Sequence, residues 1–354
     1  MFSERLKLAR KRRGLSLRAL SSAMGGIVSA QAIGKYERAE MKPSSTVAIA
    51  LAEALDVPLS YLLSPSRVSL EHVEFRKLAS TRAKDRAAVE SEVLDRVDRY
   101  LQVEEILGLD ITEQGGPDGA PYRINAVEDA EGAAMSVRVA WNLGGGPIPD
   151  ITELLEERGI KVFKWELPGS VDGLSCRVRR VRGNDVRVVV CSTGKSPERQ
   201  RFTIAHELGH LVLDIPPTVP AEKACQRFTG AFLVLGDELV REVGRRRLNF
   251  GFEELIEIKH IFGISAAALV MRMHDLGIVT EVTVRNIFSG IGRGWRTEEP
   301  RPLERTESPT RFRRLCLRAL AEHAISVSKA AELLRLKVSK IEGIMAGTDA
   351  LEYR

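Results

Sequence analysis

The chain has 354 residues, of which 44% are hydrophobic and 29% charged, and its formal net charge is +5. This length is long for one domain and sufficient for two or three, each with a core of its own. No apolar run could cross a bilayer and the first residues do not form a signal peptide, so we expect a cytoplasmic protein without membrane contact. The four cysteines are scattered without a CxxC pair, which excludes a small disulfide-stapled scaffold and favours reduced thiols.

The first 64 residues predict a bundle of short helices. We expect helices at 3–13, 17–24, 30–38, 46–55 and 58–63, with Ser16 and Ser29 as N-caps. A Gly25-Gly26 turn separates the second helix from the third, an order typical of a helix-turn-helix. Ten basic and five acidic residues give this segment a net charge of +5, equal to that of the whole chain, so the basic excess lies here.

The stretch at 31–38, Gln-Ala-Ile-Gly-Lys-Tyr-Glu-Arg, together with Pro43-Ser44 and 52–58, resembles the Xre/Cro repressor family. The Gly25-Gly26-Ile27 turn is about two residues longer than that family's usual turn. The resemblance implies binding to double-stranded DNA, with the third helix in the major groove. Paired half-sites in such DNA lead us to expect a homodimer. An alternative is a bundle that binds another repressor's helices and not DNA.

Two sets of residues are the candidate DNA contacts. The first lies at the start of the third helix, where side chains reach base edges: Ser29, Gln31, Ala32 and Lys35. The second consists of arginines that can contact phosphates: Arg13 and Arg18, with Arg10 and Arg12 beside them.

Residues 65–121 are expected to be a helical connector. The apolar spacing at 81–107 predicts one long amphipathic helix, either a dimerisation stripe or a cover for a peptidase core. The Gly/Pro-rich segment 111–121 is predicted to be a linker.

A second domain is predicted at 122–284. Helices at 125–141 and 150–158 precede β-branched runs at 160–166, 173–181 and 185–191, which predict a small antiparallel sheet. Helices around such a sheet give an α+β order.

Residues 206–210 read His-Glu-Leu-Gly-His, an HExxH pattern inside a largely apolar run. On a helix His206 and His210 share one face and can direct ring nitrogens at a single ion, and nitrogen ligands favour zinc over calcium or magnesium. Glu207 lies next to that face, where a general base could reach a water on the metal. Gly209 either allows another backbone to approach closely or has no special role.

A catalytic zinc site needs a third protein ligand and one open coordination position. Glu222 is the first choice, because it opens a predicted helix at 222–235 just past Pro216, where we expect the HELGH helix to end. Asp214 is the second choice, since it continues the face of the two histidines by one turn. Three further residues are weaker candidates for the third ligand. Asp237 and Glu238 are expected instead to cap or begin the next helix, and Cys225 is expected to lie in the core.

The stretch at 201–214, Arg-Phe-Thr-Ile-Ala-His-Glu-Leu-Gly-His-Leu-Val-Leu-Asp, and 222–228, Glu-Lys-Ala-Cys-Gln-Arg-Phe, resemble the ImmA/IrrE-type zinc metallopeptidases. The resemblance implies a zincin-like domain that binds Zn²⁺ through His206, His210 and Glu222, with Glu207 as general base. The family often has Asn four residues after the third ligand, where this chain has Gln226.

Residues 285–354 are expected to form a linker and a small helical domain. The mixture of Gly, Arg, Glu and Pro at 289–309 predicts flexibility, and helices follow at 311–322, 328–334 and 336–345. The last two helices suggest either a second helix-turn-helix or a partner-binding bundle.

The predicted fold class is therefore multidomain: an all-α helix-turn-helix bundle at 1–64, an α+β zincin-like metallopeptidase domain and a small α-helical C-terminal domain. We expect a DNA-associated zinc endopeptidase and transcriptional regulator. The resemblance implies that it cleaves a repressor or antitoxin-like protein in a stress, phage or mobile-element switch. The alternative is a DNA-binding regulator whose peptidase-like domain senses a ligand or metal without proteolysis.

Overall fold

The computed structural model describes residues 2–63, 68, 82–109, 116–169, 171–180, 184–295, 297–304 and 306–348. The chain divides into two compact units. Unit 1 comprises Met1–Glu113, Arg177–Val186 and Thr310–Arg354, and unit 2 comprises Gln114–Cys176 and Arg187–Pro309. Within the predicted connector at 65–121, residues 65–67, 69–81 and 110–115 lie outside the described residues, and the last of these stretches includes the start of the predicted linker.

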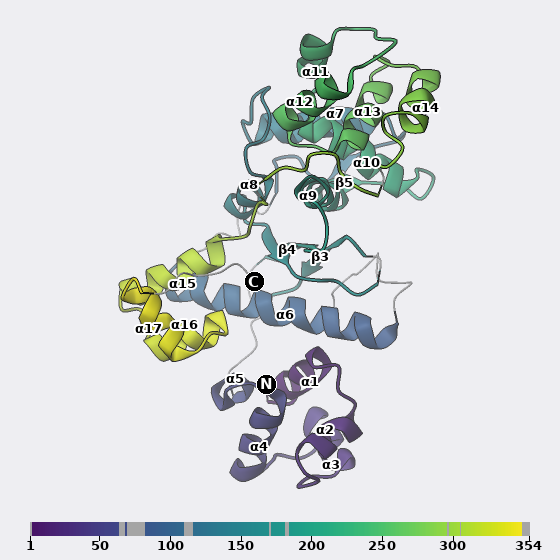
Figure 1. Cartoon of the computed structure of the whole chain (residues 1–354). Coiled ribbons are helices and arrows are strands. Elements are labelled where there is room, and N and C mark those ends of the chain that lie inside the picture. Colours follow the sequence, from purple (N-terminus) through teal and green to yellow (C-terminus); the bar gives the residue numbers. More distant parts are fainter. Residues whose placement is uncertain are drawn as a thin grey trace. The chain divides into compact units, whose positions relative to one another are not determined.

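Unit 1 is helical. Its helices are α1 (Phe2–Arg12), α2 (Leu17–Ala23), α3 (Ala30–Glu37), α4 (Ser45–Leu55), α5 (Leu59–Leu63), α6 (Ala83–Ile106), α15 (Arg311–Ala321), α16 (Val327–Leu334) and α17 (Val338–Met345) (Figure 1). The positions of α1 to α5 confirm the predicted helix-turn-helix bundle to within a few residues.

Local sequence explains where the helices of the bundle begin. Ser16, Ser29 and Ser44 each accept a hydrogen bond from a backbone N–H three residues on, which satisfies one of the free donors of the first turn. Gly25 and Gly26, between α2 and α3, have φ angles of 66° and 76°, which residues with a β-carbon rarely adopt. The turn that sets α3 at its angle therefore depends on both glycines.

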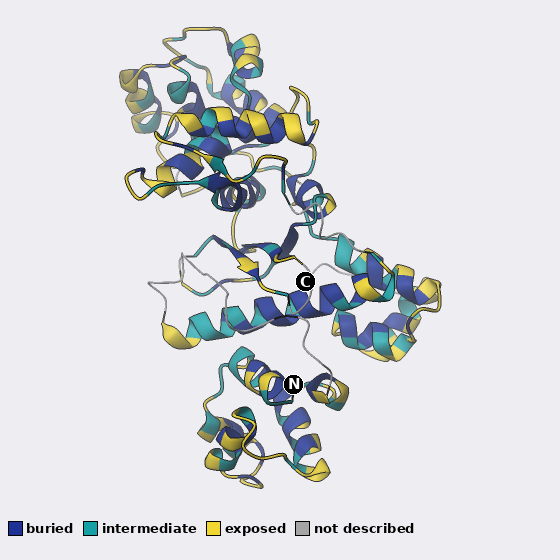
Figure 2. Cartoon of the chain, turned by 180° about the vertical axis from the view of Figure 1, so that it is seen from behind, coloured by how far each residue is buried: buried dark blue, intermediate teal, exposed yellow. Residues whose placement is uncertain are grey.

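Helix α6 is packed inside unit 1. It lies against α1 and α15 and is buried or half-buried along most of its length (Figure 2). Arg5 of α1 donates a 2.7 Å hydrogen bond to Asp98 of α6, and both side chains are almost fully buried. The apolar stripe predicted in the sequence is thus used for packing within this unit.

One buried carboxylate of α6 joins three parts of unit 1. Asp95 is 1% exposed and forms ion pairs with Arg12 of α1, Arg99 of α6 and Arg335 after α16. Arg99 also donates to the carbonyl of Leu333 at 2.5 Å. The three predicted C-terminal helices are present, and these contacts attach them to α6.

Unit 2 mixes helices with short strands. Its elements are β1 (Tyr122–Arg123), α7 (Asp129–Ala140), α8 (Ile151–Glu157), β2 (Lys161–Lys164), β3 (Gly173–Val178, which runs into unit 1), β4 (Val186–Cys191), α9 (Pro197–Val212), β5 (Leu213–Asp214), α10 (Ala221–Leu233), α11 (Gly236–Val243), α12 (Phe252–Phe262), α13 (Ala266–Asp275) and α14 (Glu281–Ser289) (Figure 1). This composition confirms the predicted α+β class. Among the described helices, none combines the length and the apolar character needed to cross a membrane.

The sheet differs from the prediction. Strands β2, β4 and β3 lie side by side in that order, and β2 pairs with β4 in parallel, with Val162 opposite Val189. The expectation of an antiparallel sheet is therefore wrong for this pair. Strand β4 is apolar except for Arg187, and β2 has an apolar centre at Val162-Phe163. Consecutive residues of both strands are buried, so both faces are covered, and such a pattern does not encode strand direction.

Helix α9 ends earlier than predicted. Leu213 adopts an extended conformation, and Leu213–Asp214 forms β5, which pairs in parallel with β1. The expectation that Pro216 ends the helix is wrong, because pairing with a strand 91 residues away replaces the last turn. That distant partner is invisible to local sequence patterns.

The segment after α14, which the sequence predicted to be flexible, is held by side-chain contacts at 299–301. Fully buried Lys259 of α12 forms ion pairs with Glu198 (2.7 Å) and Glu299 (2.9 Å) and donates to the carbonyls of Pro300 and Arg301 at 3.0 Å. Glu198 lies in the first turn of α9. One ammonium group therefore joins the start of α9 to the segment at 299–301.

We expect Lys259→Met to destabilise unit 2 by about 3–5 kcal/mol, because two buried carboxylates lose their counterion. Chemical denaturation of the full chain, followed by tryptophan fluorescence, measures the effect. Adding Glu198→Gln should recover part of the loss, since it removes one of the uncompensated charges. A single mutant as stable as the wild type would show that the ammonium does not hold this region.

Candidate metal centre and nucleic-acid interface

Helix α9 carries the HELGH sequence, and most of its residues are buried. Ser196 caps its N-terminus by accepting from the N–H of Arg199, and Pro197 occupies the first turn, where no backbone donor is needed. Ile204, Ala205 and Leu208 are fully buried in the core of unit 2. Packing on this apolar side fixes the rotation of the helix, and hence the direction of its histidines.

The two histidines point to one place. The rings of His206 and His210 lie 4.9 Å apart at 74° to one another, as expected for residues four apart on a helix. His206 is 7% exposed and His210 is half-buried. Both Nε2 atoms face the same carboxylate on α10.

That carboxylate is Glu222, in the first turn of α10. Its Oε2 lies 3.3 Å from Nε2 of His206, and its Oε1 lies 3.3 Å from Nε2 of His210. Two ligands at 2.0–2.1 Å from one tetrahedral ion are separated by about 3.4 Å, so this spacing fits Zn²⁺. Among the described residues, these three form the cluster able to hold a metal ion, with ligand atoms within 4.8 Å of one another.

Close packing of α9 against α10 makes this spacing possible. A β-carbon on Gly209 would lie 3.2 Å from Cδ1 of Phe228 and 3.5 Å from Cα of Cys225. Gly209 therefore allows the α10 backbone to approach closely, one of the two interpretations of this glycine from the sequence. The approach brings Sγ of Cys225 to 3.4 Å from Nδ1 of His210, on the side of the ring opposite Nε2.

The sequence did not predict the contact of Cys225 with the ring of His210. A hydrogen-bonding partner at Nδ1 fixes the orientation of a ligating imidazole. The available signal was its position three residues after Glu222, which places both near one face of α10.

Glu207 is 1% exposed and lies beside strand β3. Its Oε2 accepts a 2.8 Å hydrogen bond from Oγ of Ser175. Burial raises the pKa of Cys176 far above its ordinary value, and the nearby charge of Glu207 acts in the same direction. Cys176 therefore stays a neutral thiol.

The other candidate ligands lie elsewhere. Asp214 was expected to continue the face of the histidines, but it lies in β5 and forms an exposed ion pair with Arg123 at 3.0 Å. Asp237 and Glu238 lie in the first turn of α11, and Glu238 pairs with Arg241. His260, which was not among these candidates, contacts the carbonyl of Arg301 at 2.9 Å.

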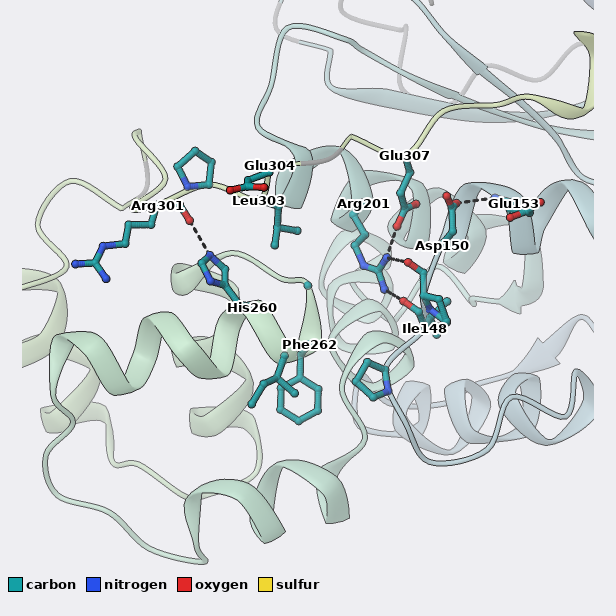
Figure 3. A pocket seen from close by; sticks show the side chains of 15 residues that line it. Ile148, Asp150, Glu153, Arg201, His260, Phe262, Arg301, Leu303, Glu304 and Glu307 are labelled. Atoms are coloured by element: carbon teal, nitrogen blue, oxygen red, sulfur yellow. Dashed lines mark hydrogen bonds and ion pairs between the residues drawn. The ribbon is translucent and has the colours of Figure 1, made fainter.

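A separate pocket of about 810 Å³ lies in unit 2, lined by residues before and in α8, the end of α12, residues 301–304 and Glu307 (Figure 3). Arg201 of α9 forms one wall, where it pairs with Glu307 and donates to the carbonyl of Ile148. Glu307 also accepts from the backbone N–H of Ile151 at 3.0 Å. Burial raises the pKa of Glu307, although Arg201 acts in the opposite direction. The pocket thus contacts the helix that carries HELGH, five residues before His206.

The candidate base contacts lie on α3. Gln31 and Lys35 are exposed and one turn apart, and Ala32 is half-buried. Ser29 is exposed, and its Oγ accepts from the N–H of Ala32 at 3.2 Å, so its hydroxyl also caps the helix.

The candidate phosphate contacts divide into two groups. Arg18 and Arg13 are exposed, the latter 3.8 Å from Asp56. Arg10 donates to both carboxylate oxygens of Glu37 on α3, at 2.5 and 2.8 Å, and Arg12 pairs with Asp95. The structure therefore gives Arg10 and Arg12 a role in holding α1 to its neighbours, which charge counting could not reveal.

Comparison with known proteins agrees with this geometry. Residues 6–62 match the model of a helix-turn-helix family, and residues 155–274 match that of the IrrE N-terminal-like domain of the M78 peptidases. The chain joins a helix-turn-helix domain to an M78-type peptidase domain. Both resemblances seen in the sequence are thereby confirmed. No curated protein and no solved structure matches the chain.

The geometry of the M78-type domain leads to a prediction about metal. We expect His206→Ala and Glu222→Ala to lose bound zinc, because each removes one of three ligands. Asp214→Ala should keep it, since Asp214 pairs with Arg123. Elemental analysis of the purified proteins after zinc loading and dialysis gives the metal content. Equal zinc in Glu222→Ala and the wild type would exclude Glu222 as the third ligand.

Proposed function

We propose that this protein is a DNA-associated zinc endopeptidase that acts as a transcriptional regulator. The observation that carries the proposal is the convergence of His206, His210 and Glu222, with 3.3 Å separations, on a helix that carries Glu207 next to His206. The match to the M78 peptidases supports a metallopeptidase type of chemistry.

The mechanism follows from the positions of these side chains. Zinc, when bound, supplies a Lewis acid that polarises the scissile carbonyl and acidifies water. His206, His210 and Glu222 would hold the ion and leave one position open. Glu207 would accept the proton of the attacking water and deliver it to the leaving amine. Its burial keeps bulk water from competing for that proton.

The helix-turn-helix domain supports DNA as a partner. Exposed Gln31 and Lys35 would meet base edges, and Arg13 and Arg18 would meet phosphates. Joining a DNA-binding domain to a peptidase raises the effective concentration of the peptidase near a DNA-bound protein. We therefore propose a repressor or antitoxin-like protein as the substrate, and the cytoplasm as the place of action.

A second candidate function is a regulator whose peptidase-like domain binds a ligand without cutting. The pocket beside Arg201 favours it, because the wall of that pocket belongs to α9. A ligand there could bias α9 only by binding one arrangement of the Arg201–Glu307 pair more tightly than another. The two candidates differ in whether Glu207 is needed.

We expect Glu207→Gln to reduce proteolysis by about 10²- to 10⁴-fold, the contribution typical of a general base. Because the substrate is unidentified, new protein N-termini can be compared in cells that express the wild type or the mutant. Termini present only with the wild type would identify the substrate and the cleaved bond.

Zinc content and DNA affinity are the controls for this mutant, and both should equal those of the wild type. A mutant that keeps full regulatory activity in cells would favour the ligand-binding regulator. A mutant that has lost its zinc would mean that Glu207 acts through the metal site itself.

DNA binding by the α3 surface should depend steeply on salt. The logarithm of affinity should fall linearly with the logarithm of salt concentration, because phosphate contacts release counterions. Arg13→Ala and Arg18→Ala should each reduce the magnitude of this slope by about one, because each removes a proposed phosphate contact. Fluorescence anisotropy with duplex DNA at several salt concentrations measures the slopes.

Arg285→Ala is a matched control, since Arg285 is an exposed arginine on α14, outside the helix-turn-helix domain. Its slope should equal that of the wild type. Salt-independent binding, or equal slopes in all variants, would favour the alternative in which this bundle binds a protein.

A further inference from the structure

Strand β3 approaches α9 closely at Gly173. A β-carbon there would overlap Cγ2 of Thr203 on α9 and would lie 3.0 Å from the carbonyl oxygen of Val190. It would also lie 3.4 Å from Cγ of Glu207. Glycine is therefore the residue that lets this strand lie directly against the helix, beside Glu207.

Ser175 lies two residues further along β3, so its side chain leaves the strand on the same face as position 173. Its Oγ is 2.8 Å from Oε2 of Glu207. An ionised carboxylate only accepts hydrogen bonds, so the hydroxyl of Ser175 is the donor. Ser175 is half-buried and Glu207 is 1% exposed, and a charge-assisted bond is stronger where water is scarce.

We propose that Ser175 is a positioning residue for Glu207. The inference rests on the proposed function, since it assigns the means by which the general base is oriented. Ser175 holds Oε2, which fixes the plane of the carboxylate and turns Oε1 to receive the proton of the attacking water. Ser175 keeps its own proton throughout and does not touch the substrate.

The contact has a geometric cause that is independent of the hydrogen bond itself. Without the close approach at Gly173, the strand would stand farther from α9 and Ser175 could not reach Glu207. Two neighbouring positions on one face of β3 therefore act together. Gly173 has no side chain and allows the strand to approach, and Ser175 supplies the hydroxyl.

The test uses the full-length protein loaded with Co²⁺, whose visible absorption reports the metal environment, and acetohydroxamate as the probe. The hydroxyl of the probe can hydrogen-bond to Glu207 when its oxygens meet the metal. Ser175→Ala should raise the Kd of acetohydroxamate about three- to tenfold, the effect of losing a hydrogen bond to a charged group. Cobalt content should be unchanged, because Ser175 is not a ligand.

Three further variants make the outcome specific. Ser175→Thr keeps the hydroxyl and should restore affinity to within about twofold of the wild type. Ser136→Ala removes a serine hydroxyl that donates to the carbonyl of Gly132 on α7, and it should have no effect. In a Glu207→Gln background, Ser175→Ala should add nothing, because a residue that acts only through Glu207 is not additive with its loss.

Each result decides the matter. Equal affinity for Ser175→Ala and the wild type, with cobalt bound to both, would overturn the role of Ser175 and leave the proposed function standing. An equal loss in the Glu207→Gln background would overturn it too, since the effect would not pass through Glu207. A wild type that binds no cobalt would overturn both the inference and the proposed function.

Discussion

The close packing of α9 against α10 at Gly209 is the contact on which the candidate metal centre depends. HExxH on a single helix supplies two nitrogen ligands, and the third must come from another element. Because Gly209 has no side chain, Phe228 and Cys225 can lie against the α9 backbone, and the first turn of α10 then places Glu222 between both imidazoles. A larger residue at 209 would separate the helices and move the carboxylate away from the histidines.

Other contacts fix α9 at its remaining sides. Its first turn is held by the buried pair of Glu198 and Lys259, and its next turn by Arg201 and Glu307. The strand β3 lies against its middle, where Gly173 permits the approach. A catalytic group must be held to within a fraction of an ångström, and a helix restrained at several points along its length provides that rigidity.

In unit 1, net charge indicates a class of partner but not which arginines are free to contact it. The sequence places a net charge of +5 in the first 64 residues, which agrees with the match of residues 6–62 to a helix-turn-helix family. Arg10 and Arg12 nevertheless serve as internal ties to Glu37 and Asp95. Which arginines remain exposed depends on which carboxylates the fold brings to them, and Asp95 is more than 80 residues away from Arg12.

The sequence by itself determined whatever depends on neighbours along one helix. These features are the HExxH face and the serine caps of α2 and α3, because residues three or four apart on a helix are neighbours in any fold. The helix-turn-helix order and the α+β class are likewise set by local periodicity and by turn residues. Tertiary structure decided what depends on distant partners. Parallel pairing of β2 with β4, the strand at Leu213 that removes Asp214 from the histidine face, and the contact of Ser175 with Glu207 all join separate segments. Their formation is governed by packing across the core, which no local pattern of residues records.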